Sequence, residues 1–248
     1  MKAIIIAAGS GKRINSKVKK LPKSMIPVNG KPILEHQIST LNEIGINEIY
    51  VITGPYSDKF TINNIQYVKD LKYLEHDILG SLMEAKNFLD DDVVIIYSDI
   101  IFEKKIMLQI LESKNEISIA IDMNWEKMYE GRTEHPKTEA ENVLLDEKNQ
   151  ILKIQKNIIN SNNKVGEFLG IIKLTSKGGE IFTKIHDDLV VNHKGTFHEA
   201  PSIFKAYLTD FIQELIDLEI FVQPIFISGK WCEIDTEQDL MKAEKIFN

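Results

Sequence analysis

The chain begins with a predicted buried strand that runs directly into a glycine turn. Residues 3–8 are a continuous apolar run rich in β-branched side chains, which predicts a strand buried on both faces, as in a parallel sheet. The turn Gly9-Ser10-Gly11 follows at once, and glycines let backbone N–H groups approach a ligand closely. Residues 1–34 hold eight basic side chains and no acidic one, although the whole chain has a formal charge of −7. This local excess of positive charge predicts a polyphosphate ligand rather than a solvated surface loop.

Two common phosphate-binding motifs do not fit this turn. A Walker A loop requires a lysine followed by serine or threonine, and Lys12 is followed by Arg13. A dinucleotide fingerprint requires a third small residue where Ile14 stands, and an acidic residue at the end of the second strand. The second predicted strand, residues 48–52, is followed by Thr53 instead. A nicotinamide-dependent oxidoreductase is therefore disfavoured.

The same segment carries a family resemblance. It rests on two stretches, Ala7-Ala8-Gly9-Ser10-Gly11-Lys12-Arg13 and Leu21-Pro22-Lys23. They resemble the signature of the nucleotidyltransferases that activate sugar phosphates, phosphocholine and phosphonates with a nucleoside triphosphate. The resemblance implies that the turn wraps the triphosphate, with the nucleotide-binding residues Ala7, Ala8, Gly9, Ser10, Gly11 and Lys12. It also implies that Arg13 and Lys23 neutralise the triphosphate and are the catalytic residues.

Charge and composition limit the binding partners and the cellular compartment that the chain can have. The acidic balance, with a pI of about 5.5, argues against nonspecific nucleic-acid binding. The single cysteine, Cys232, rules out an intrachain disulfide and fits a reducing compartment. No run approaches the length of a membrane span, and no signal peptide is evident. We therefore expect a cytoplasmic protein with no nucleic-acid or membrane partner, folded as one domain over residues 1–248.

Strand and helix patterns alternate through most of the chain. Strands are predicted at residues 48–52, 65–68, 93–97, 117–121, 166–174 and 220–227, and helices at 32–44, 80–89, 176–193, 202–217 and after Thr236. This alternation predicts an α/β fold with a Rossmann-like, mostly parallel sheet and helices on both faces. The apolar stripe of residues 202–217 is wide, which we attribute to core packing, with a homodimer face as the alternative.

Two aspartates are candidates for holding a metal ion. Asp99 comes directly after the strand at 93–97, at the carboxyl end where open α/β sheets bind ligands. Asp235 precedes a helix whose start is marked by the capping box of Thr236 and Asp239. Both segments are similar to the metal-binding segments of the family, which implies that Asp99 and Asp235 together hold Mg²⁺. Glu233 either supports this site or faces solvent.

The alternation breaks at residues 122–167, which are polar, charged and aromatic and contain a predicted hairpin at 143–154. We expect this small insertion to cover the acceptor. The stretches Asp77-Ile78-Leu79-Gly80-Ser81-Leu82, Tyr129-Glu130-Gly131-Arg132-Thr133-Glu134-His135-Pro136 and Gly166-Glu167-Phe168-Leu169-Gly170 resemble the cytidylyltransferases of phosphonates and phosphocholine more than the hexose-phosphate enzymes.

That narrower resemblance assigns residues to the acceptor and to the base. Arg132 and Lys156 would hold the phosphoryl group of the acceptor, and Glu167 would face its polar tail. Arg132 also stands out because only two of the thirty basic residues are arginines, and arginine binds phosphate bidentately where lysine cannot. His135 either acts on the acceptor or is structural. Gly80 and Ser81 would lie near the cytosine.

The predicted reaction is attack by an oxygen of the acceptor on the α-phosphorus of CTP, with release of pyrophosphate and no covalent nucleophile. The candidate acceptors are phosphocholine, 2-aminoethylphosphonate, 2-hydroxyethylphosphonate and a phosphorylated amino acid or amide such as glutamine phosphate, for surface polysaccharide or phosphonate biosynthesis. A sugar-1-phosphate nucleotidyltransferase using UTP or dTTP, and a catalytically silent nucleotide-binding protein, remain the alternatives.

Overall fold

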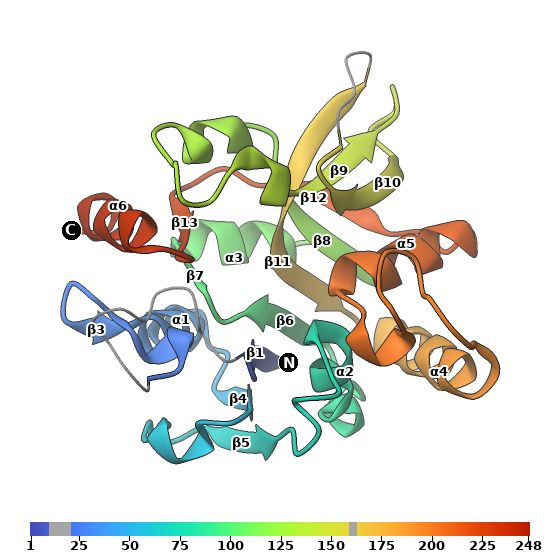
Figure 1. The fold of residues 1–248 in the computed structure, drawn as a ribbon, viewed down its shortest axis with the longest axis horizontal. Coiled ribbons are helices and arrows are strands. Elements are labelled where there is room, and N and C mark those ends of the chain that lie inside the picture. The colour runs from blue at the N-terminus through green and yellow to red at the C-terminus, as the bar shows by residue number, and fades with distance from the viewer. Residues whose placement is uncertain (10–20, 159–162) are drawn as a thin grey trace.

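The computed structural model describes residues 1–9, 21–158 and 163–248 (Figure 1). Four of the predicted nucleotide-binding and catalytic residues lie outside these ranges: Ser10, Gly11, Lys12 and Arg13. Among the residues that are described, no helix has both the length and the apolar character needed to cross a bilayer.

A parallel sheet forms the centre of the molecule. Strand β1 (Lys2–Ala7) pairs in parallel with β4 (Glu48–Thr53) on one side and with β6 (Val93–Tyr97) on the other. Beyond β4 lies β5 (Gln66–Lys69), again parallel. The β-branched run predicted from sequence is the middle of this sheet because its side chains are buried on both faces, Ile4 and Ile5 being fully inaccessible to solvent.

The other half of the sheet is organised by one long strand, β11 (Lys164–Leu174), which runs antiparallel to β6, β8 (Ile117–Asp122) and β9 (Glu141–Leu145). Strand β9 forms a hairpin with β10 (Ile151–Lys156), and β12 (Gln223–Phe226) lies parallel to β8. The predicted Rossmann-like α/β fold and the predicted hairpin are thus confirmed, with the antiparallel pairs gathered on the β11 side of a largely parallel centre.

Helices cover both faces of the sheet, as predicted. On one face α1 (Ile33–Glu43) and α3 (Lys104–Leu111) contribute Leu34 and Ile106 to a core cluster. On the other face a second cluster takes in Leu82 of α2 (Ile78–Met83), Phe182 of α4 (Ser176–Asn192) and Phe211 of α5 (Leu208–Asp217). The part of the apolar stripe that lies on α5 is core, as expected, since Leu208, Phe211, Ile212 and Leu215 are fully buried, whereas Phe204 ahead of α5 is exposed.

Two predicted helices are shorter than expected. The segment 202–217 divides into a 3₁₀ turn, Ile203–Lys205, and α5, and the segment 80–89 divides into α2 and a 3₁₀ turn, Lys86–Phe88. Helix α2 also begins earlier than predicted, because the Asp77 side chain accepts a hydrogen bond from the N–H of Ile78 and caps the helix there.

Two small sheets complete the fold and were not predicted. Strands β2 (Pro27–Val28) and β3 (Lys31–Pro32) pair ahead of α1. Strand β7 (Ile100–Phe102) pairs antiparallel with β13 (Trp231–Glu233), and α6 (Glu237–Ile246) follows β13. The β7–β13 pair brings the C-terminal segment against the end of β6, so it decides where the candidate site lies.

Candidate active site

Two cavities meet at the carboxyl end of β6. The larger has a volume of about 720 Å³ and the smaller about 120 Å³. Both are lined by Tyr97, Asp99 and Asp235, so they share a wall. The predicted nucleotide-binding residues Ala7, Ala8 and Gly9 line the larger cavity, and they come from the end of β1.

Lys23 stands at the junction of the two cavities. It begins the 3₁₀ turn Lys23–Met25, and its Nζ lies 2.8 Å from Asp99 Oδ2 and 2.6 Å from Asp235 Oδ1. Burial acts to lower the pKa of Lys23, but the two aspartates outweigh it and raise the pKa well above its ordinary value. The lysine therefore carries its charge, and the structure brings together three predicted site residues that come from three separate segments of the chain.

The two aspartates are brought together by the β7–β13 pair. Glu233 pairs with Ile100, and the N–H of Ile234 donates to the carbonyl oxygen of Asp99 at 2.9 Å. The capping box at the start of α6 then fixes the next turn. Asp239 Oδ2 accepts hydrogen bonds from the N–H groups of Asp235 and Thr236, at 3.1 and 2.9 Å. The capping box predicted from sequence is confirmed.

The donor set at this junction fits a hard divalent cation. Asp99 and Asp235 converge on one positive charge, the ammonium of Lys23. The other oxygen of Asp99, Oδ1, is buried and has no hydrogen-bond partner among the described residues. Carboxylate oxygens are the ligands that Mg²⁺ takes from proteins, together with phosphate oxygens and water.

His135 and Glu233 extend this acidic group into the smaller cavity. His135 is buried, with Nδ1 3.0 Å from Asp235 Oδ2 and Nε2 3.9 Å from Glu233 Oε2. Burial, and then the nearby carboxylates of Asp235 and Asp99, raise the pKa of Glu233 well above its ordinary value. Burial also acts to raise the pKa of Asp235, but the hydrogen bonds and charges of His135 and Lys23 lower it overall. Glu233 lines the cavity and does not simply face solvent.

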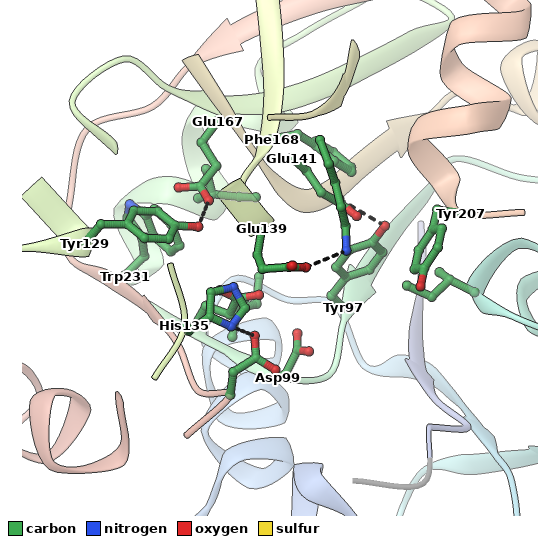
Figure 2. A pocket seen from close by; sticks show the side chains of 16 residues that line it. Tyr97, Asp99, Tyr129, His135, Glu139, Glu141, Glu167, Phe168, Tyr207 and Trp231 are labelled. Carbon is green, nitrogen blue, oxygen red and sulfur yellow. Dashed lines mark hydrogen bonds and ion pairs between the residues drawn. The ribbon is translucent and has the colours of Figure 1, made fainter. Parts of the chain in front are cut away.

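The far wall of the smaller cavity is rich in glutamates and aromatic rings (Figure 2). Glu167, on β11, accepts a hydrogen bond of 2.5 Å from the hydroxyl of Tyr129 through Oε1. Its other oxygen, Oε2, is buried and has no partner among the described residues. Burial raises the pKa of Glu167 to about 8 and that of Glu141 to about 7. These carboxyl groups therefore change protonation in the neutral pH range.

Lys156 is the cation on this wall. Its Nζ lies 3.1 Å from Glu139 Oε2 and 5.1 Å from the centre of the Tyr207 ring. Both Lys156 and Glu139 line the smaller cavity, and Figure 2 shows Glu139 there. The predicted acceptor residues His135, Lys156 and Glu167 therefore come together around one cavity.

Arg132 behaves differently from the other predicted acceptor residues, because it lines neither cavity. Its guanidinium engages Asp239, with Nε 2.7 Å from Oδ1 and Nη2 2.9 Å from Oδ2. A third contact, of 3.4 Å, joins Nη2 to Glu233 Oε2. The side chain is only 6% exposed. The arginine thus supports the start of α6 from within the protein.

The two residues predicted to lie near the base, Gly80 and Ser81, also differ in whether they line a cavity. Ser81 lines the larger cavity, and its hydroxyl donates to Asp70 Oδ2 at 2.7 Å. Gly80 lines neither cavity. A Cβ at Gly80 would lie 2.7 Å from the carbonyl oxygen of Phe204 and 2.8 Å from the ring of His76, so the glycine is needed for close packing.

Sequence reasoning missed Asp70 and His76, which form a group with the predicted Ser81 beside the larger cavity. A signal was available, because Asp70 directly follows β5 just as Asp99 closely follows β6. An acidic residue after a parallel strand is placed at the edge of the sheet where ligands bind. The strand β5 is only four residues long, which made this position inconspicuous.

A largely parallel sheet with a large cavity at its carboxyl edge, and with a lysine and two aspartates lining that cavity, is an arrangement suited to binding nucleotides. Residues 3–137, more than half of the chain, match the MobA-like NTP transferase domain. The chain belongs to this family and is a nucleotidyltransferase.

Similar proteins include several nucleotidyltransferases. The chain is 27% identical to the CTP:phosphoglutamine cytidylyltransferase of Campylobacter jejuni, over 97% of this chain and 98% of that protein. It is 29% identical to the bifunctional protein GlmU of Methanocaldococcus jannaschii, but it spans only 54% of that protein's length.

Among solved structures, the CTP:phosphocholine cytidylyltransferase of Streptococcus pneumoniae superposes with a TM-score of 0.71 at 21% identity, over 100% of this chain and 99% of that one. The inositol-1-phosphate CTP transferase of T. maritima gives 0.73 at 18% identity, over 98% and 96%. These two likenesses support the fold.

Proposed function

We propose that the chain is a cytidylyltransferase, which transfers CMP from CTP to a small phosphorylated or phosphonate acceptor and releases pyrophosphate. The observation that carries this proposal is the meeting of Lys23, Asp99 and Asp235 between two cavities of unequal size. On this proposal CTP takes the larger cavity, with its phosphates at the turn that follows β1. The acceptor takes the smaller cavity, so that its phosphoryl oxygen faces the α-phosphorus across the junction.

The reaction needs positioning and neutralisation of charge more than covalent chemistry. An acceptor oxygen forms a bond to the α-phosphorus, and the bond to the bridging oxygen of the pyrophosphate breaks. Lys23 neutralises the phosphates at the junction, and Arg13 is predicted to assist it. Asp99 and Asp235 are the residues that would hold Mg²⁺, whose charge, when it is bound, polarises the reacting phosphoryl group.

The size of the smaller cavity assigns it to the acceptor. Its volume of about 120 Å³ is far below the 720 Å³ of the larger cavity, so the nucleotide is placed in the larger one and the phosphoryl end of the acceptor in the smaller one.

The polarity of the same cavity favours an acceptor whose tail forms hydrogen bonds. Glu167 offers a buried oxygen without a partner among the described residues, and Glu141 and Glu139 lie on the same wall. Lys156 is the cation available there for the acceptor's phosphoryl group, and His135 borders it. Arg132 supports these residues from behind, through Glu233 and Asp239. The similarity to a CTP:phosphoglutamine cytidylyltransferase over nearly the whole chain is in keeping with an acceptor that bears an amide or amine.

Pyrophosphate release tests this proposal directly. CTP, UTP, dTTP and ATP are each incubated with Mg²⁺ and with glutamine phosphate, phosphocholine, the two phosphonates or glucose 1-phosphate. We expect release only with CTP and one of the small acceptors. Release only with UTP or dTTP and glucose 1-phosphate would contradict the proposal. Silence with every pair, together with CTP binding in calorimetry, would favour a nucleotide-binding protein without this activity.

A sugar-1-phosphate nucleotidyltransferase is the second candidate. The observation in its favour is the similarity of 28–29% to GlmU proteins over essentially all of this chain. The chain spans about half the length of those proteins, so their full activities do not transfer to it. The glutamates that line the smaller cavity, Glu139, Glu141 and Glu167, suit an amine or amide tail, and this counts against a sugar phosphate.

A further inference from the structure

We propose that His76 recognises the base of the nucleotide, and that it selects the 4-amino group of cytosine over the 4-carbonyl group of uracil or thymine. This inference rests on the proposed function, because it takes the larger cavity as the nucleotide site. It adds a specificity residue, His76, and a positioning residue, Asp70, to that site.

His76 lines the larger cavity, in which the proposed function places the nucleotide. The phosphate end is marked by Lys23 and by the turn at Gly9, which both line this cavity. The remaining wall includes Tyr56, Tyr73 and His76, which offer aromatic surface suited to a base. On the proposed function, a nucleotide with its phosphates at Lys23 places its base against this aromatic part of the lining.

Asp70 determines which ring nitrogen of His76 carries hydrogen. The Asp70 side chain is inaccessible to solvent and accepts three hydrogen bonds. The donors are the hydroxyl of Ser81 at 2.7 Å, the N–H of Lys72 at 2.8 Å and Nδ1 of His76 at 3.1 Å. An ionised carboxylate can only accept, so Nδ1 is the N–H of the ring. In the neutral imidazole the other nitrogen, Nε2, is then a hydrogen-bond acceptor.

The ring of His76 is held in place by its neighbours. Gly80 packs against its Cγ and Cδ2 edge so closely that a Cβ would lie 2.8 Å from these atoms. Phe204 lies nearly parallel to the ring, at 6.2 Å between ring centres. Lys205 donates to the carbonyl oxygens of His76 and Leu74, which fixes the backbone of the segment. Nε2 makes no hydrogen bond to any described residue, so it is available to a ligand.

An acceptor at this position distinguishes the pyrimidines. Cytosine carries an amino group at position 4, which donates hydrogen bonds, whereas thymine and uracil carry a carbonyl oxygen there, which accepts them. Nε2 of the neutral His76 can pair with the amino group, but it meets the carbonyl as a second acceptor. A site built to bind an N–H group rejects the analogue that lacks it, because its own polar group is left unpaired.

The test is the ratio of dissociation constants for UTP and CTP, measured by calorimetry, with turnover as a second readout. In His76→Gln the amide presents both a donor and an acceptor at similar reach, so the preference for CTP should fall about tenfold. The matched control is His198→Gln, at an exposed histidine that lines neither cavity, and it should keep the wild-type ratio.

A second variant tests the role of Asp70 separately. In Asp70→Asn the amide can donate to Nδ1, which moves the ring hydrogen to Nε2 and lets that nitrogen donate to a carbonyl group. We expect UTP to gain affinity relative to CTP, which a general loosening of the site would not produce. Melting temperatures establish that each variant is folded.

The outcomes separate this inference from the proposed function. If the wild type prefers CTP while His76→Gln and Asp70→Asn keep its ratio, the role of His76 is wrong and the proposed function stands. If the wild type does not prefer CTP over UTP, both are wrong. A ratio that falls in His76→Gln, shifts toward UTP in Asp70→Asn and is unchanged in His198→Gln supports the inference.

Discussion

Lys23 donates a hydrogen bond to Asp235, a residue 212 positions away in the sequence, with 2.6 Å between Nζ and Oδ1. The same ammonium reaches Asp99, which lies at the end of β6. Three segments distant in the chain therefore meet at one partly buried charge. This charge stands between the two cavities, where the proposed phosphoryl transfer takes place.

Replacing Lys23 by alanine should reduce turnover far more than it changes the fold. Removing one preorganised charge from a phosphoryl-transfer site costs on the order of 10²-fold in rate. Lys86→Ala is the control, because Lys86 is an exposed lysine that also pairs with an aspartate, Asp187, at 2.8 Å. Turnover and circular dichroism are measured for both variants. Full turnover in a folded Lys23→Ala protein would remove Lys23 from the mechanism.

The two aspartates at the junction should control the metal requirement. We expect Asp99→Asn and Asp235→Asn each to raise the Mg²⁺ concentration for half-maximal activity by about tenfold or more, since each removes a charged ligand. A chelator should abolish wild-type activity. Asp187→Asn, at an exposed aspartate on α4, is the control. A Mg²⁺ dependence that is identical in Asp99→Asn and the wild type would contradict the assignment.

Local patterns were sufficient to predict most of the fold. The continuous apolar runs at β1, β6 and β8 identify buried strands because burial on both faces leaves no polar alternation. The capping box of Thr236 and Asp239 fixed the start of α6 because both partners lie within one turn. Resemblance to the family then supplied Lys23, Asp99 and Asp235 as members of one site.

The parts that could not be predicted depend on contacts between distant segments. Strands β7 and β13 are three residues each, too short to show an alternation of apolar and polar residues. They also pair although they lie far apart in the sequence. The partner of Arg132 is Asp239, which no local pattern indicates. An arginine that is one of two in the chain suggested a ligand contact, whereas its buried carboxylate partners occupy it within the protein.

Arg132 and Asp239 should behave as a coupled pair in unfolding experiments. The side chains are 6% and 1% exposed, and breaking a buried ion pair leaves an uncompensated charge that costs about 3–5 kcal/mol. Arg132→Met and Asp239→Asn should each lower the free energy of unfolding, and the double variant should lose less than the sum of the two. Urea unfolding of the four proteins gives the coupling energy. Additive losses, with a raised KM for the acceptor, would instead support the original prediction that Arg132 binds the acceptor.

Glu167 should make the stability of the protein depend on pH. Burial raises the pKa of Glu167 to about 8 from an ordinary value of 4.5, so the folded state holds this proton more tightly than the unfolded state. The protonated Glu167 therefore contributes its full share to the free energy of unfolding below pH 4.5. This share is lost as the pH rises from 4.5 through 8, at up to about 1.4 kcal/mol per pH unit.

The variant Glu167→Gln keeps an acceptor for the Tyr129 hydroxyl and should flatten the decline in stability between pH 5 and 8. Glu147→Gln, at an exposed hairpin glutamate, should leave it unchanged. A decline of equal slope in Glu167→Gln would show that other groups cause it.

Two glycine variants should separate packing from ligand binding. In Gly80→Ala the new Cβ meets the carbonyl oxygen of Phe204 at 2.7 Å and the His76 ring at 2.8 Å, so the protein should lose about 1–3 kcal/mol of stability.

In Gly9→Ala no described atom lies within 4 Å of the new Cβ, so stability should change by less than about 0.5 kcal/mol. Gly9 lines the larger cavity, where a Cβ stands in the path by which phosphates approach the backbone, so CTP affinity should fall. Urea unfolding and calorimetry with CTP measure the two effects. If Gly9→Ala bound CTP as the wild type does, the phosphates would not lie at the turn after β1, and the orientation proposed for the nucleotide would have to be reversed.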